Sequence, residues 1–146
     1  MVIEVLRWVN GVSEDELLKD SVVMGIGSEK VSVRVPSSVH LLKAKLANLV
    51  SINQKGRQDG RHVMILFRVI PAYLKQLIES VDAEVRTERD IVNILGTLLE
   101  IVTAERNSKI LDALQLEAKL LFSSLPSKSF LKIASFKKHQ LQRAFQ

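Results

Sequence analysis

The chain has 146 residues, with 21 Lys and Arg against 16 Asp and Glu, which gives a formal net charge of +5. This length is typical of one domain, and a composition of 47% hydrophobic and 25% charged residues is that of a globular rather than a disordered protein. Cysteine is absent, which excludes disulfides, thiol catalysis and zinc sites with Cys ligands.

The N-terminal residues combine helical patterns with charge. Residues 2–9 predict a short helix, and Ser13 with Glu16 forms a capping-box signature that predicts a second helix through about residue 23. Charged side chains interrupt the apolar residues near the N-terminus, and no uncharged stretch approaches the roughly 20 residues of a membrane-spanning helix. We therefore expect an intracellular protein, cytoplasmic or nuclear, without a signal peptide or transmembrane segment.

One segment has the pattern of a β-strand. In residues 30–35, valines alternate with polar side chains, as in a strand with one buried face, and Pro36 ends the run. A strand needs a partner, and the apolar, β-branched run at residues 62–69 is the candidate. The alternative is that residues 62–69 extend the following helix, with Pro71 in its first turn.

The rest of the chain predicts helices, which makes the fold mainly α. Ser37 or Ser38 begins a helix through about residue 50, and Thr87 with Asp90 forms a second capping signature. Four helices in residues 71–146 are joined by short loops, which favours antiparallel neighbours. They are predicted at residues 71–81, from Thr87 through about 102, at 109–123, and from Ser127 or Ser129 to about 145.

These elements predict a single domain, residues 1–146, built as an antiparallel helical bundle. Stacked helical hairpins of the solenoid type are the alternative architecture. The N-terminal part, residues 1–70, mixes helices with a minor β element near 30–35 and 62–69, and residues 71–146 form the four-helix part.

Charge is organised in blocks along the chain. Residues 1–29 carry two basic and six acidic side chains, and residues 69–118 carry five and nine. Residues 30–68 carry eight basic and one acidic side chain, and residues 119–146 carry six basic and none acidic. Either neighbouring helix faces neutralise one another, which is the more common arrangement, or the two basic segments meet on one surface and attract a polyanion.

The second arrangement predicts a backbone-directed RNA or DNA site. The loop at residues 55–62 combines glycines with three cations, although a solvated turn explains the same pattern. Phe136 is the one aromatic ring expected outside the apolar face of the last helix, so stacking on bases would be scarce. The nucleic-acid or anion-binding candidates are Lys43, Lys45, Lys55, Arg57, Arg61, Lys132, Lys137, Lys138 and Arg143.

Catalytic and metal-binding motifs are missing from the sequence. The three histidines have no second ligand at helical spacing, and neither a phosphate-binding loop nor a G-x-S-x-G turn occurs. The clustered carboxylates fall in first helical turns, where the helix dipole accounts for them. We therefore expect no enzymatic activity, no metal and no cofactor.

These considerations rank three functions. The first is a non-enzymatic helical module for protein–protein interaction or assembly, through a protein partner or self-association, because its apolar arcs are wider than one small core requires. The second is the nucleic-acid site above, and the third and weakest is attachment to anionic membrane through residues 129–146. The interface candidates are Leu111, Leu116, Phe122 and Phe136.

Overall fold

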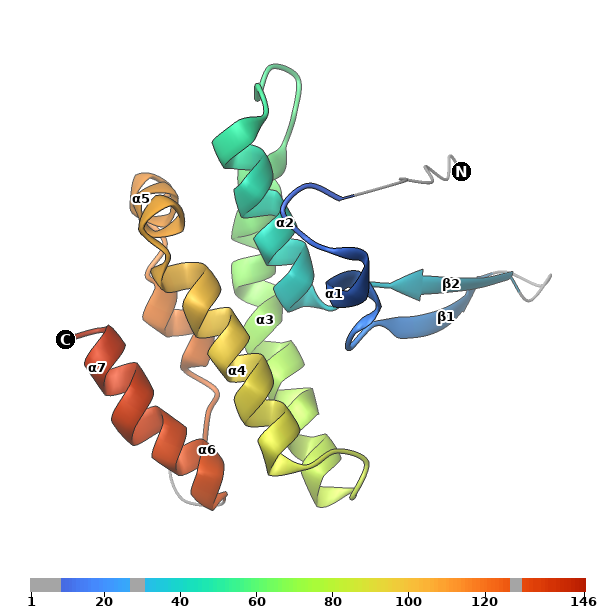
Figure 1. Ribbon diagram of the computed structural model, residues 1–146, viewed down its shortest axis with the longest axis vertical. Coiled ribbons are helices and arrows are strands. Elements are labelled where there is room, and N and C mark those ends of the chain that lie inside the picture. Colours follow the sequence, from blue (N-terminus) through green and yellow to red (C-terminus); the bar gives the residue numbers. More distant parts are fainter. Residues whose placement is uncertain (1–8, 27–30, 127–129) are drawn as a thin grey trace.

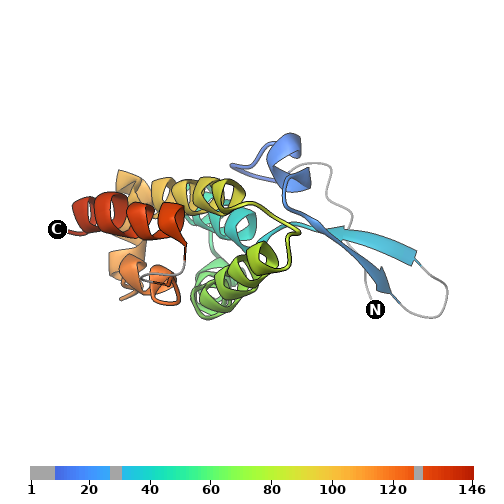
Figure 2. The ribbon, with the colours of Figure 1, turned by 90° about the horizontal axis from the view of Figure 1, so that it is seen from below.

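The protein is mainly α-helical with one small antiparallel sheet, as the sequence predicts. Its computed structural model describes residues 9–26, 31–126 and 130–146. Figure 1 shows packed helices from which two strands project as a ribbon to one side, and the same projection is seen in Figure 2. The ribbon and the C-terminal helix therefore lie at opposite ends of the molecule.

The ribbon forms where the sequence predicted the end of a helix. The capping box of Ser13 and Glu16 is present, but α1 (Glu14–Leu18) ends five residues before the predicted limit near residue 23. The next residues form β1 (Val22–Ile26), which pairs with β2 (Val31–Val35). The predicted strand at residues 30–35 is thus confirmed for residues 31–35. The helix predicted at residues 2–9 lies outside the described residues, except for Val9.

Two long helices follow and pack against each other. Ser37 caps α2 (Ser38–Ser51), as predicted. Residues 62–69 are not the partner strand; they belong to α3 (Asp59–Asp82), which continues through Pro71. Proline leaves the carbonyl four residues earlier without its usual helical donor. A continuous buried face outweighs that loss, and its apolar members are Val63, Ile70, Leu74, Leu77 and Ile78.

The second capping signature is also confirmed, because Thr87 and Asp90 form a complete capping box at the start of α4 (Glu88–Thr103). The predicted helix at 109–123 is instead two pieces. The first is α5 (Glu105–Ala113), and the second is a short 3-10 helix, η1 (Ala118–Phe122). The chain breaks between them at Gln115, whose φ of +57° is left-handed and cannot continue a right-handed helix.

The last helix lies against α4 (Figure 1). It runs without interruption through α6 (Leu131–Phe136), the π turn η2 (Lys137–Leu141) and α7 (Gln142–Ala144). The predicted helix is therefore present, although Ser127 and Ser129, its predicted first residues, lie outside the described residues.

The prediction that the ring of Phe136 is accessible is wrong, because Phe136 lies three residues after Ile133 on the buried face of α6. In a regular α-helix, residues five apart point in different directions, whereas an i→i+5 turn brings them to one side. The π turn η2 therefore places Leu141 on the side of Phe136, and both are buried together with Ile133. The core that these side chains join is almost entirely aliphatic; among its fully buried members are Leu42, Leu46, Ile70, Leu74, Ile91, Leu95, Leu98, Leu121 and Ile133.

Candidate interaction surfaces

The β1–β2 ribbon has one apolar face. Directly paired residues of an antiparallel ribbon lie on the same face, and the register pairs Val22 with Val35 and Met24 with Val33. Val22 is 56% exposed and Met24 is 53% exposed, while the two valines of β2 are half-buried. On the opposite face Val23 pairs with Arg34, and Val23 is 57% exposed.

Both edges of the ribbon are open within the described part of the chain, because the sheet contains only these two strands. The outer edge of each strand presents backbone N–H and C=O groups to solvent. The five residues of β1, Val22–Ile26, include no charged residue and no proline, which are the features that usually protect an edge from pairing.

The base of the ribbon is fixed to the helical body by polar contacts. Asp20, at φ +57°, turns the chain from α1 into β1, and its carboxylate accepts a hydrogen bond from Arg86 Nη1 at 2.7 Å. Arg34 Nη1 donates to Ser21 Oγ at 3.1 Å. The contact of Asp20 with Arg86 therefore joins the base of the ribbon to the helical body, whereas the contact of Arg34 with Ser21 joins the two sides of the ribbon at its base.

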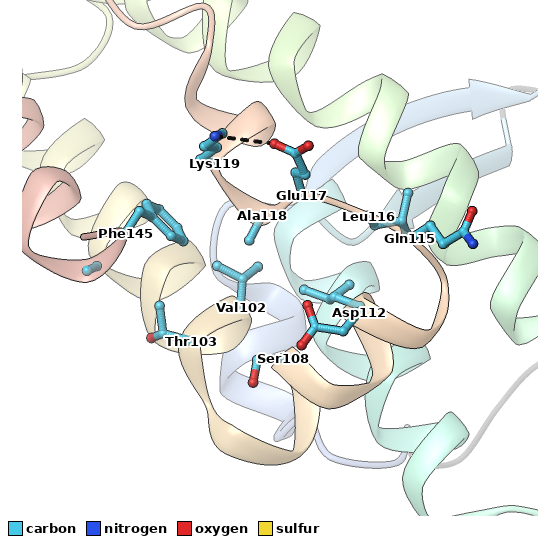
Figure 3. A pocket seen from close by; sticks show the side chains of 12 residues that line it. Val102, Thr103, Ser108, Asp112, Gln115, Leu116, Glu117, Ala118, Lys119 and Phe145 are labelled. Carbon is cyan, nitrogen blue, oxygen red and sulfur yellow. Dashed lines mark ion pairs between the residues drawn. The ribbon is translucent and has the colours of Figure 1, made fainter.

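A groove of about 580 Å³ lies between four parts of the chain: the C-terminal end of α4, α5, the start of η1, and residues 144–145 (Figure 3). Phe145 closes one side of it, and Asp112 and the ion pair of Lys119 with Glu117, at 3.4 Å, line the other parts. Its hydroxyls are not poised as nucleophiles. Thr103 donates to the carbonyl of Leu99, and Ser108 donates to the carbonyl of Glu105.

A second groove, of about 460 Å³, continues beyond Phe145 between η1 and the C-terminal helix. Phe122 and Leu141 form its apolar floor, and Lys119, Lys137 and Lys138 line it. Lys137 is held in place by a hydrogen bond to the carbonyl of Leu125 at 3.0 Å. This groove is therefore both apolar and positively charged.

The basic loop between α2 and α3 is organised around a buried carboxylate. Asp59 is 2% exposed and accepts hydrogen bonds from Lys45 at 3.0 Å, Arg57 at 2.7 Å and Asn48 at 3.4 Å. Burial alone would raise the pKa of this carboxyl, but the three hydrogen bonds outweigh it and hold the pKa at about 2. Two of the predicted anion-binding cations are therefore used inside the protein.

A third candidate cation is also paired internally. Lys43 donates to Glu16, and this contact is the largest cause that lowers the pKa of Glu16 to about 2. It ties α1 to α2. Nearby, His40 is buried against Ser37, and burial lowers the pKa of its ring.

The two basic segments do not meet on one surface. The turn between α2 and α3, with Lys55 and Arg57, lies at the top of Figure 1, whereas the C-terminal helix lies at the lower left. Lys55, Arg57 and Arg61 are exposed near that turn, although Arg57 is paired with Asp59, and the remaining exposed candidates are Lys132, Lys138 and Arg143 on the C-terminal helix. The nucleic-acid candidates thus separate into two groups at different ends of the molecule.

Three of the four predicted interface residues belong to the core. Leu111 is 2% exposed, Phe122 is 3% and Phe136 is 2%. Leu116 is partly buried against the same core. These three side chains are used in packing α5 and α6 against α4 and η1 against α3, so the expectation that they face a partner is wrong for them. The exposed apolar side chains of the ribbon were missed because residues 22–26 had been assigned to the end of a helix.

No group of three or more His, Asp or Glu side chains suited to a metal ion occurs among the residues that the structure describes. Within the same residues, no helix is both long enough and apolar enough to cross a membrane. Comparison of the chain with protein families, with curated proteins and with solved structures finds no match.

Proposed function

We propose that this protein is a protein–protein interaction module that docks on its partner through the β1–β2 ribbon. The observation that carries the proposal is an apolar ribbon that stands away from the helical body with both edges unpaired in the described chain. A two-stranded ribbon is marginally stable in water unless a further strand or a covering surface is added. Docking would supply that missing partner.

An extended strand of another chain is the occupant that fits this element best. Its backbone would add to the open β1 edge, and alternate apolar side chains would continue the face of Val22 and Met24. Because β1 has no charge, a strand pairing there desolvates no ionic group. Self-association is the special case in which the added strand is β1 of a second copy, antiparallel to the first.

The proposal is tested with Met24→Lys, which places a charge in the apolar face, and with Leu131→Lys as the matched control. Leu131 is 84% exposed and lies on the C-terminal helix, away from the ribbon. We expect Met24→Lys to abolish association while the control retains it. Association is measured first as self-association, by sedimentation velocity of the pure chain.

If the pure chain is monomeric, the unmodified chain is used to capture a binding partner, and the partner is purified. Binding of this purified partner to the same two variants is then compared. Hydrogen exchange then reports the site, because docking protects the backbone amides of β1 from exchange. If both variants associate as the unmodified chain does, or if protection appears only outside the ribbon, the proposal is wrong.

A further inference from the structure

The C-terminal helix, residues 131–144, has a second surface that the ribbon does not explain. Most of its large apolar residues face the core, since Ile133, Phe136 and Leu141 are buried. The opposite side is exposed and, apart from Leu131 in the first turn, mainly polar. We name this side the C-terminal polar face; its residues are Lys132, Ser135, Lys138, His139, Gln142 and Arg143.

The surroundings of this face carry positive charge. Residues 119–146 include six cations and no acid. On one side of the helix lies the 460 Å³ groove lined by Lys119, Lys137 and Lys138, and on the other lies a groove of about 350 Å³ lined by Arg89, Lys132 and His139. The described residues that line these two grooves include no carboxylate.

Part of this charge is not neutralised by neighbours. Lys132, Lys138 and Arg143 form no ion pair with any residue in the described ranges. The carboxylate of Glu88 accepts a hydrogen bond from the backbone N–H of Lys132 at 2.8 Å, and so helps to fix the start of the helix. This differs from the α2–α3 turn, where the buried carboxylate of Asp59 already holds two of the cations.

We propose that the C-terminal polar face binds the phosphodiester backbone of a nucleic acid. Its lysines and arginine supply charge, and Ser135 and Gln142 add the hydrogen-bond donors that commonly contact phosphates. Stacking of bases on this face is limited to the single imidazole of His139, because Phe136 is buried and Phe145 packs against Phe122 outside the face. Binding is therefore directed to the backbone and is independent of sequence.

The same features argue against the two other anionic surfaces. A helix that lies in a membrane buries its apolar side in the lipid, whereas this helix buries that side against α4. An acidic protein partner would need several apolar or aromatic anchors, whereas Leu131, at 84%, and Phe145, at 36%, are the two large apolar side chains exposed among residues 130–146. Binding to phosphates requires neither a free apolar helix side nor apolar anchors.

The test measures the fluorescence anisotropy of a labelled single-stranded RNA, and of a labelled DNA duplex, as each is titrated with the full chain. With three phosphate contacts, affinity should fall about 20- to 40-fold between about 50 and 200 mM salt. We expect the double variant Lys138→Glu/Arg143→Glu to bind at least about tenfold more weakly at low salt, since two contacts are replaced by repulsion. The milder Lys138→Gln/Arg143→Gln should show a smaller loss in the same direction.

The matched control is Lys55→Glu/Arg61→Glu, which makes the same change in net charge at the other end of the molecule. It should lose no more than about threefold, because its charges are far from the bound backbone compared with the Debye length. Equal loss in both double variants would mean that net charge alone attracts the probe, and it would overturn the proposed site.

Two further outcomes also overturn it: no binding of either probe at low salt, or binding only to vesicles that contain phosphatidylserine. Circular dichroism of each variant establishes that the fold is retained. This inference is independent of the ribbon, because Met24→Lys should leave the affinity for both probes unchanged.

Discussion

Replacing Asp59 by Asn removes the charge around which the α2–α3 turn is organised. The carboxylate accepts hydrogen bonds from three side chains and is almost completely buried. The pKa of Asp59 is about 2 in the folded chain, against an ordinary value of 3.8 for this carboxyl. The folded state therefore favours the ionised form, and this preference is a contribution to the free energy of unfolding.

The size and sign of the effect follow from this difference in pKa. Because the folded pKa is lower than the unfolded one, the contribution is complete above the unfolded pKa and is lost as the pH falls through the folded pKa. It amounts to about 2 kcal/mol at neutral pH, about 1 kcal/mol at pH 3 and a fraction of that at pH 2. We expect Asp59→Asn to lower the free energy of unfolding accordingly.

Urea denaturation, followed by circular dichroism, of the unmodified chain and of Asp59→Asn at several pH values measures this difference. Subtracting the two curves removes the titration of Glu16, whose pKa is also about 2. The control Asp82→Asn changes an exposed carboxylate and should shift stability by less than about 0.5 kcal/mol. A difference for Asp59→Asn that stays constant between pH 7 and pH 2 would refute the reasoning, since it would not arise from ionisation.

Two further predictions concern the helical body, and both are measured by urea denaturation at neutral pH. Leu95→Ala empties a fully buried position of α4 and should cost about 3–5 kcal/mol, whereas Leu131→Ala, at an 84% exposed site, should cost less than about 0.5 kcal/mol. Similar losses for the two would contradict the assigned core. Thr87→Ala removes the hydroxyl that caps α4 and should cost about 1 kcal/mol, and an unchanged midpoint would show that the capping box does not stabilise this helix.

Signals that lie within a few residues of each other were sufficient to predict several elements. Ser37 begins α2 and Thr87 begins α4 because a capping side chain bonds to backbone groups only three residues away. The alternating valines of residues 31–35 predicted a strand for the same reason, since their period of two is a local property. Residues 119–146 contain no acidic side chain, so the sequence alone predicted that the C-terminal helix carries positive charge.

Elements whose conformation depends on distant partners were predicted less well. Val22–Ile26 continues the apolar pattern of α1, and it becomes a strand because β2 supplies its hydrogen bonds. Residues 62–69 are apolar and β-branched, yet packing against α2 makes them helical and carries α3 through Pro71. Local propensity could not decide between these outcomes, because the energy of burial exceeds it.

The candidate surfaces divide in the same way. Composition and spacing identified which residues carry charge, whereas only the folded chain determined that Lys43, Lys45 and Arg57 are paired internally and that two basic segments lie apart. The ring of Phe136 is buried because it lies three residues after Ile133 on the face of α6 that packs against α4. The π turn that follows brings Leu141 to the same side, and no local pattern in the sequence predicts such a turn. Helix capping and periodicity are short-range, while exposure is decided by whichever segments meet across the core.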